Sequence, residues 1–216
     1  MGPLDIERLQ VGVFGTNCYI LMDPETKQGY IIDPGAEARN ILSAAERMGL
    51  DCEGVLCTHG HMDHVGAVGK VAEATGAPVY ISEEDSDVLS GSAQGLGGRI
   101  GSLLVSKPRG VVGLSAGAAL GFGSHSVKVL ATPGHTRGSM SFLCGDNLFC
   151  GDLVFEGSIG RTDLRGGSLP ALLEAVSREV FVLPPETKIF PGHGPATTVG
   201  AEMATNPFLR DLPREA

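Results

Sequence analysis

Residues 57–67 have the sequence CTHGHMDHVGA, which holds three of the six histidines of the chain. The apolar run GVLCT leads into this cluster, and the run HVGAVGKVAEATG that follows has the apolar spacing of a helix. The cluster is therefore predicted to lie in a loop between a strand and a helix, where α/β proteins place their chemistry. Its potential metal ligands are His59, His61, Asp63 and His64.

Three more apolar runs end in a residue of the same kind, namely KVLATPG before His135, NLFCG before Asp152 and KIFPG before His193. Alternate residues of an extended segment point the same way, so His59 and His61 can hold one ion, which His135 would complete. Asp152 has two carboxylate oxygens and could bridge this ion to a second one. Imidazole and carboxylate ligands without thiolate suit zinc, with iron or manganese as alternatives.

The second ion would be held where the chain turns into the helix. Asp63 and His64 can face it there, and His193 would complete its shell. A simpler interpretation is that Asp63 or His64 only caps the helix, and a single His-x-His pair is often incidental. Capping explains neither the two preceding histidines nor the residues that follow the other three strands. The whole set therefore favours a site for two metal ions, each with one position open for water.

The composition limits the classes of function. The chain has 216 residues, a net charge of −9 and a pI near 5.1, so nucleic acid is not expected as a partner. The N-terminal MGPLDIERLQ does not resemble a signal peptide, and no apolar run approaches the ~18 residues that span a membrane. The five cysteines include no Cys-x-x-Cys pair, so we expect free, mostly buried thiols and a cytoplasmic location. His125 lies outside the pattern of strand ends and is expected at the surface.

Strand-like and helical runs alternate along the chain. The predicted strands include CYILMD, GYIID and PVYIS, the predicted helices include AEARNILSAAERMG and LPALLEAVSREVFVLP, and CGDN is typical of a hairpin turn. Residues 84–125 are rich in glycine and serine without a stable period, which favours a long surface connection, with a lid over the site as the alternative. No repeat or linker divides the chain, so we predict a single mixed α/β domain over residues 1–216.

The residues THGHMDH, together with those at positions 135, 152 and 193, resemble the metallo-β-lactamase superfamily over nearly the whole chain. The resemblance implies an αββα four-layer sandwich, in which two mixed β-sheets pack face to face with helices outside and the metal site at one edge. It also implies the role of each ligand. These are His59, His61 and His135 for the first metal, Asp63, His64 and His193 for the second, and Asp152 as the bridge.

Four segments narrow the resemblance to the glyoxalase II-like (hydroxyacylglutathione hydrolase-like) branch, namely VFGTNCYIL, PGHTRGS, GDLVFEGSIGRTDL and FPGHGP. Full glyoxalase II enzymes carry a helical C-terminal extension that helps to hold glutathione. Only 23 residues follow His193 (216 minus 193), so the match is to short, single-domain relatives. Arg161 in the GRTD segment could contact an anionic substrate or pair with Asp163, and the pairing is favoured.

The branch implies hydrolysis of a thioester such as S-lactoylglutathione by a hydroxide that bridges two metal ions and is oriented by Asp63. The alternative is a mononuclear iron persulfide dioxygenase with His59, His135 and Asp152 as ligands. A lactonase would use the same hydroxide on an ester. A secreted β-lactamase, an RNA-processing nuclease and a non-catalytic metal-stabilised module fit less well. The small thioester is the expected partner, with no nucleic acid or membrane, and the sequence leaves the oligomeric state open.

Overall fold

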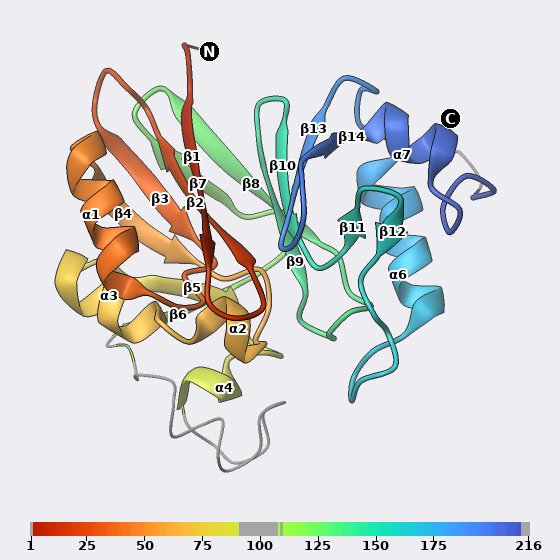
Figure 1. The fold of residues 1–216 in the computed structure, drawn as a ribbon, viewed down its shortest axis with the longest axis horizontal. Helices are drawn as coiled ribbons and strands as arrows, with labels where there is room; N and C mark the ends of the chain where they lie inside the picture. The colour runs from red at the N-terminus through yellow and green to blue at the C-terminus, as the bar shows by residue number, and fades with distance from the viewer. Residues whose placement is uncertain (1, 91–107, 109, 213–216) are drawn as a thin grey trace.

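Two β-sheets packed face to face form the centre of the protein in the computed structural model, which describes residues 2–90, 108 and 110–212 (Figure 1). The first sheet contains, in spatial order, β1 (Asp5–Val11), β2 (Thr16–Met22), β3 (Gln28–Ile32), β4 (Asp51–Leu56), β5 (Val79–Ser82) and β6 (Val111–Leu114). The second contains β14 (Thr197–Thr198), β13 (Lys188–Pro191), β10 (Asn147–Gly151), β9 (Met140–Cys144), β8 (His125–Ala131) and β7 (Ala119–Phe122). A short ribbon of β11 (Val154–Phe155) and β12 (Ser158–Ile159) follows β10.

Both sheets are mixed. In the first, β3 to β6 run parallel to one another, whereas β1 and β2 are joined in antiparallel pairs. In the second, only the pair of β10 and β13 is parallel. The β9–β10 hairpin turns at the CGDN segment, as predicted.

Alternation along β2 explains how one sheet serves two layers. Cys18 and Ile20 face the cluster under the helices, whereas Tyr19 and Leu21 face the cluster between the sheets. Every residue of β2 is buried, because both faces of the sheet are covered. The core between the sheets also contains Phe142, Phe149 and other side chains of the second sheet.

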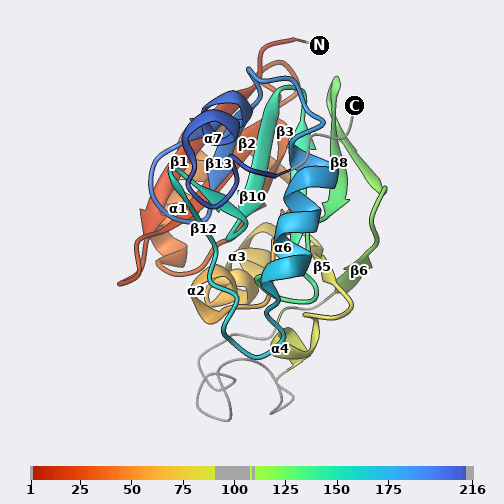
Figure 2. The ribbon, with the colours of Figure 1, turned by 90° about the vertical axis from the view of Figure 1, so that its right-hand side faces the viewer.

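Helices cover both outer faces. The first sheet is covered by α1 (Ala38–Met48) and α3 (Val68–Thr75), and the second by α6 (Leu169–Ala175), the π-helical η1 (Val176–Val180) and α7 (Val199–Thr205). Figure 2 looks onto the side of the molecule that carries α6 and α7. The short helices α2 (Met62–Val65) and α4 (Asp87–Ser90) lie nearer the edge of the first sheet. The predicted αββα sandwich is confirmed.

The segment predicted as a long surface connection, residues 84–125, has regular structure in its described part. It contains α4, β6 and β7, of which β6 pairs with β5 and β7 pairs with β8. Both strands lie at sheet edges and are largely exposed, so they lack the buried apolar alternation that sequence reasoning depends on. The alternative of a lid rests largely on residues 91–107 and 109 of this segment, which lie outside the described residues.

The expectation of a surface position for His125 is wrong. Its ring is buried, stacks on Phe122 with the centroids 5.4 Å apart, and places Nε2 3.2 Å from the carbonyl oxygen of Pro3. His125 begins β8, whose side chains alternate between buried and exposed, and it takes the first inward position. The contacts of its ring are with Phe122, Pro3 and Asp23, and none of these residues belongs to the histidine cluster.

The five cysteines are free, and all but Cys52 are buried. Burial raises the pKa of the Cys150 thiol to about 12. Cys57 is fully buried beside the histidine cluster, and burial raises its pKa as well. Neither thiol is therefore suited to be a nucleophile, and both agree with the expectation of free, mostly buried thiols.

Candidate metal centre

Five strands end at the edge of the fold where the polar cluster lies. The segments that follow β4, β8, β10 and β13 carry the seven predicted ligands, of which Asp63 and His64 lie in α2, and the end of β3 carries Asp33. The structure brings all seven predicted ligands together, in groups whose candidate ligand atoms lie within 4.8 Å of one another. The groups are His59, His61 and His135; His59, His64 and Asp152; and Asp63, His64 and His193.

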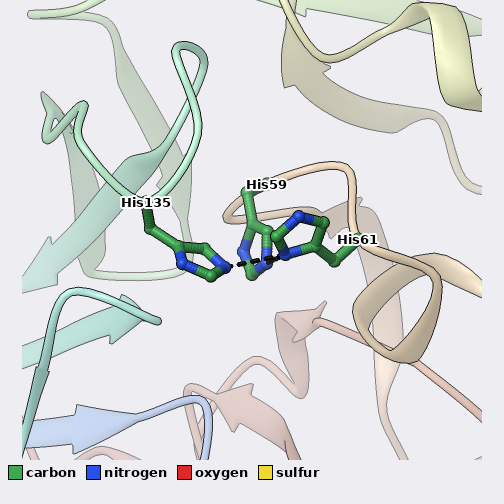
Figure 3. Close-up of side chains that lie close together, drawn as sticks. All are labelled: His59, His61 and His135. Atoms are coloured by element: carbon green, nitrogen blue, oxygen red, sulfur yellow. Dashed lines mark hydrogen bonds between the residues drawn. The ribbon is translucent and has the colours of Figure 1, made fainter. Parts of the chain in front are cut away.

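Three imidazoles converge in the first group (Figure 3). His61 Nδ1 lies 3.0 Å from His59 Nε2 and 2.7 Å from His135 Nε2. His135 Nδ1 lies 2.7 Å from the carbonyl oxygen of Arg161, which can only accept a hydrogen bond. The proton of a neutral His135 is therefore on Nδ1, and Nε2 presents a lone pair to the cluster.

A hydrogen bond at Nδ1 also orients His59. Thr58 Oγ1 donates its proton to Asp33 Oδ2 at 2.6 Å, so at 3.1 Å it accepts from His59 Nδ1 and leaves His59 Nε2 bare. Burial and the neighbouring imidazoles lower the pKa of His59, and they lower the pKa of His61 to about 4. Neutral rings with lone pairs aimed at one point are what a cation requires. A proton on His61 Nδ1 could form a hydrogen bond with only one of its two neighbours, His59 Nε2 or His135 Nε2.

Asp33 also orients His64. His64 Nδ1 donates to Asp33 Oδ2 at 2.9 Å, which directs Nε2 towards Asp152 Oδ1 at 3.4 Å. Burial lowers the pKa of His64, but the carboxylates of Asp152 and Asp33 raise it more, so that it lies well above its usual value. His64 Nε2 and Asp152 Oδ1 are buried without a hydrogen-bond partner among the described residues. Such an atom costs about 1–3 kcal/mol, and a metal ion bound to both atoms would remove that cost.

Asp63 and His193 complete the second group on its exposed side. Asp63 Oδ2 lies 3.2 Å from His193 Nε2 and accepts a hydrogen bond from Thr16 Oγ1 at 3.2 Å. Burial raises the pKa of Asp63, but the hydrogen bond with His193 and the nearby His64 outweigh it and hold the pKa below its usual value. The side chains of Asp63 and His193 are 26% and 28% exposed, against 0% for His64. The site therefore opens to solvent on this side.

Asp152 lies between the two groups. Its Oδ2 is 3.4 Å from His135 Nε2 in the first group, and its Oδ1 is 3.7 Å from His193 Nε2 in the second. Burial raises the pKa of Asp152, but His64 and the other nearby imidazoles outweigh it, so the carboxyl group is held ionised. One carboxylate therefore faces both groups, one oxygen to each. The donors fit metal ions that prefer imidazole and carboxylate.

Three supporting residues were not identified from the sequence. Asp33 accepts hydrogen bonds from the backbone and side chain of Thr58 and from His64, and Thr16 holds Asp63. Asp33 follows the apolar run GYII directly, which is the same signal that identified the ligands.

Arg161 pairs with Asp163 in the fork geometry that was favoured. Its Nε and one terminal nitrogen each lie 2.8 Å from a carboxylate oxygen of Asp163. Its carbonyl oxygen holds His135, so the backbone of this residue supports the metal centre. A contact between the Arg161 side chain and substrate stays a prediction.

The fold and the polar cluster are those of the metallo-hydrolase superfamily. Residues 11–193 match the family model of the metallo-beta-lactamase superfamily, and the chain belongs to that superfamily. The chain is 36% identical over 205 residues to the probable metallo-hydrolase YqgX of Bacillus subtilis, covering 94% of this chain and 96% of that protein. It is 33% identical over 210 residues to the hydroxyacylglutathione hydrolase GloC of Haemophilus influenzae, covering 95% of this chain and 98% of that protein.

Solved structures give the same result. The BLEG-1 B3 metallo-beta-lactamase has a TM-score of 0.84 at 35% identity, covering 95% of this chain and 99% of that one. TTHA1623 in a di-iron-bound form has a TM-score of 0.82 at 40% identity, covering 94% and 100%. ETHE1 from Myxococcus xanthus has a TM-score of 0.77 at 30% identity, covering 94% and 83%.

The described helices bear on the membrane prediction. None of those in residues 2–90 and 110–212 combines the length and the apolar character needed to cross a bilayer. The cytoplasmic location, the absence of a nucleic-acid partner and the single-domain organisation stay predictions.

Proposed function

We propose that the chain is a dinuclear metal-dependent hydrolase of the glyoxalase II-like branch, which cleaves thioesters such as S-lactoylglutathione. The observation that carries this proposal is the position of Asp152 between the two ligand groups, with one oxygen towards each. A carboxylate in this position is suited to hold two ions near each other, as in two-metal hydrolases. Zinc is the proposed metal, with iron or manganese as alternatives.

The first ion would be held by His59, His61 and His135, and the second by Asp63, His64 and His193, with Asp152 shared between them. When bound, such ions lower the pKa of a coordinated water to near neutrality and polarise the substrate carbonyl. Hydrolysis then joins the water oxygen to the acyl carbon and breaks the carbon–sulfur bond, and the thiol leaves with a proton.

Asp63 is the proposed catalytic residue. Its low pKa keeps the carboxylate ionised at neutral pH, so it can accept a hydrogen bond from the attacking water and fix its orientation. Thr16 donates to one oxygen of Asp63 and limits its rotation. Asp63 also lies on the side of the site that opens to solvent, where a substrate can approach.

The thioester substrate is proposed from the similarity to GloC, whose name describes a hydroxyacylglutathione hydrolase. Arg161 is occupied by Asp163, so the substrate carboxylates need other cations. Arg137 lines a hollow of about 320 Å³ beside the His135 loop, which Gly166 and Gly167 also line. We propose Arg137 as the first candidate and Arg161 as the second for contacting an anionic substrate.

A second candidate function is that of a mononuclear iron persulfide dioxygenase. His135 Nε2 lies 3.4 Å from Asp152 Oδ2, and the rings of His59 and His135 have centroids 4.7 Å apart, so one ion could be held by this face of two histidines and one carboxylate. It ranks second because it gives no role to Asp63, His64 and His193, which also lie together.

The test compares substrates on protein whose metal content has been measured. Release of thiol from S-lactoylglutathione is followed for the wild type and for Asp63→Asn, with Glu84→Ala, an exposed residue outside the cluster, as the control. Oxygen uptake is measured with glutathione persulfide. Hydrolysis of a lactone and of a β-lactam is measured as well. We expect thioester hydrolysis by the wild type and the control, and a loss of about 100-fold in Asp63→Asn. Oxygen uptake without thioester hydrolysis would overturn the proposal in favour of the dioxygenase.

A further inference from the structure

A single carboxylate oxygen joins the two loops that carry the three-histidine group. Asp85 Oδ2 accepts a hydrogen bond from the backbone nitrogen of Gly60 at 2.9 Å and another from Thr136 Oγ1 at 2.7 Å. Gly60 stands between His59 and His61, and Thr136 follows His135 directly. Because the two loops are far apart in the sequence, their relative position depends on contacts of this kind.

Asp85 is itself held firmly. Its backbone nitrogen donates to Ser82 Oγ at 3.3 Å, and Ser82 is the buried last residue of β5. After Asp85 the chain enters α4, where Val88 and Leu89 are buried in the core under the helices. The carboxylate therefore projects from a segment that is fixed on both sides.

The order of donors in this network is determined. Ser139 Oγ accepts from the backbone nitrogen of Thr136 and lies 2.8 Å from Thr136 Oγ1. Thr136 Oγ1 gives its only proton to Asp85, so the Ser139 hydroxyl must donate to Thr136. A hydroxyl that donates to a carboxylate makes a charge-assisted hydrogen bond, the stronger class.

Glycine at two positions lets both loops approach Asp85. A Cβ on Gly138 would collide with Ser82 Oγ and would lie 2.7 Å from Asp85 Cγ. A Cβ on Gly60 would lie 3.0 Å from the carbonyl oxygen of Asp85 and 3.2 Å from its Cβ. The two ligand loops thus each have a glycine where they meet the same aspartate, which indicates that the close contact is built into the site.

We infer that Asp85 is a positioning residue for the three-histidine metal site, which fixes the His59–His61 loop and the His135 loop relative to each other. Its carboxylate acts through the backbone of one loop and the hydroxyl of the other. The inference concerns metal binding alone, so it holds whatever substrate the enzyme takes.

The experiment measures affinity for Zn²⁺ and Co²⁺ on the full chain by competition with a chromogenic chelator, together with the Co²⁺ absorption spectrum. Asp85→Ala should lower the affinity for the ion at the three-histidine site by about 10- to 100-fold and change the Co²⁺ bands. The affinity for the other ion should be affected less. Asp85→Asn keeps an acceptor oxygen in place and should recover much of the loss. Glu84→Ala, an exposed neighbour, is the matched control and should bind both ions as the wild type does.

Thr136→Val provides a second test if the metal-free Asp85→Ala variant unfolds. It removes the hydroxyl that donates to Asp85 and accepts from Ser139, and it should weaken binding of the same ion by about tenfold. Thr136→Ser keeps this hydroxyl and should restore the affinity. Metal affinities in Asp85→Ala equal to those of Glu84→Ala would overturn the inference. So would wild-type affinity in Thr136→Val, or an equal loss of both ions.

Discussion

Replacement of Asp33 by asparagine tests whether the ligand histidines depend on this buried carboxylate. Asp33 Oδ1 accepts from the backbone nitrogen of Thr58 at 2.7 Å, and Oδ2 accepts from Thr58 Oγ1 at 2.6 Å and His64 Nδ1 at 2.9 Å. Asparagine offers one oxygen and one NH2 group to these partners. Whichever way the amide is turned, its NH2 group meets at least one N–H donor, and that donor is left without an acceptor.

The expected magnitude follows from this count. A hydrogen bond to a charged group contributes about 1.5–3 kcal/mol, which corresponds to a factor of about 10 to 150 in an equilibrium constant. An NH2 group facing His64 would favour the proton on Nε2, the atom that should bind metal. We therefore expect Asp33→Asn to weaken metal binding by about 10- to 150-fold, and turnover at limiting metal to fall in parallel.

The assay is chelator competition for Zn²⁺, with thermal unfolding of the metal-free protein measured in parallel. Asp23→Asn is the matched control, because Asp23 is also buried and accepts hydrogen bonds from Ser124 and from the backbone of Glu25, outside the metal cluster. It should change unfolding without changing metal affinity. If the two variants bound Zn²⁺ equally well, the role of Asp33 in orienting the histidines would be refuted.

Three further predictions concern the ligands, the pH and the substrate. Asp152→Ala should impair metal occupancy and turnover severely, whereas His125→Ala should leave both unchanged per folded molecule; similar behaviour of the two would show that the ligand assignment is wrong. The pKa values of His64 and His193 are raised, so a metal ion that binds there must displace protons. Equilibrium dialysis at pH values from about 8 down to about 6 should therefore show that the ion at His64 and His193 is lost before the ion at the three-histidine group. Arg137→Ala should raise KM for S-lactoylglutathione with little change in kcat. Steady-state kinetics will check this, with a thioester that lacks the glutamyl and glycyl ends as the comparison substrate.

The ligand set could be predicted because its members gather in the short segments that follow four apolar runs. This pattern is local, so it is visible in a single sequence. Asp33 follows the same pattern, but DPG is also typical of a turn, and its partners become apparent only when β3 lies parallel to β4. Asp85 falls within an acidic segment that resembles an ordinary solvated turn, and its role depends on two loops that are distant in sequence.

The elements that were mispredicted owe their structure to tertiary contacts. β6 and β7 are short and mostly exposed, and they form because each pairs with a neighbouring strand at the edge of a sheet. His125 is polar and lies after a glycine-rich stretch, so nothing local indicates that its ring packs on Phe122. Propensity is a weak guide where tertiary packing determines the outcome.

Two metal ions that share Asp152 are the central feature proposed for this protein. The most direct test is a crystal structure, with anomalous scattering data, of protein purified without added metal. We predict two transition-metal ions per chain, one at His59, His61 and His135 and one at Asp63, His64 and His193, with Asp152 contacting both. A single iron ion, with Asp63 and His193 uncoordinated in a fully occupied site, would contradict this prediction.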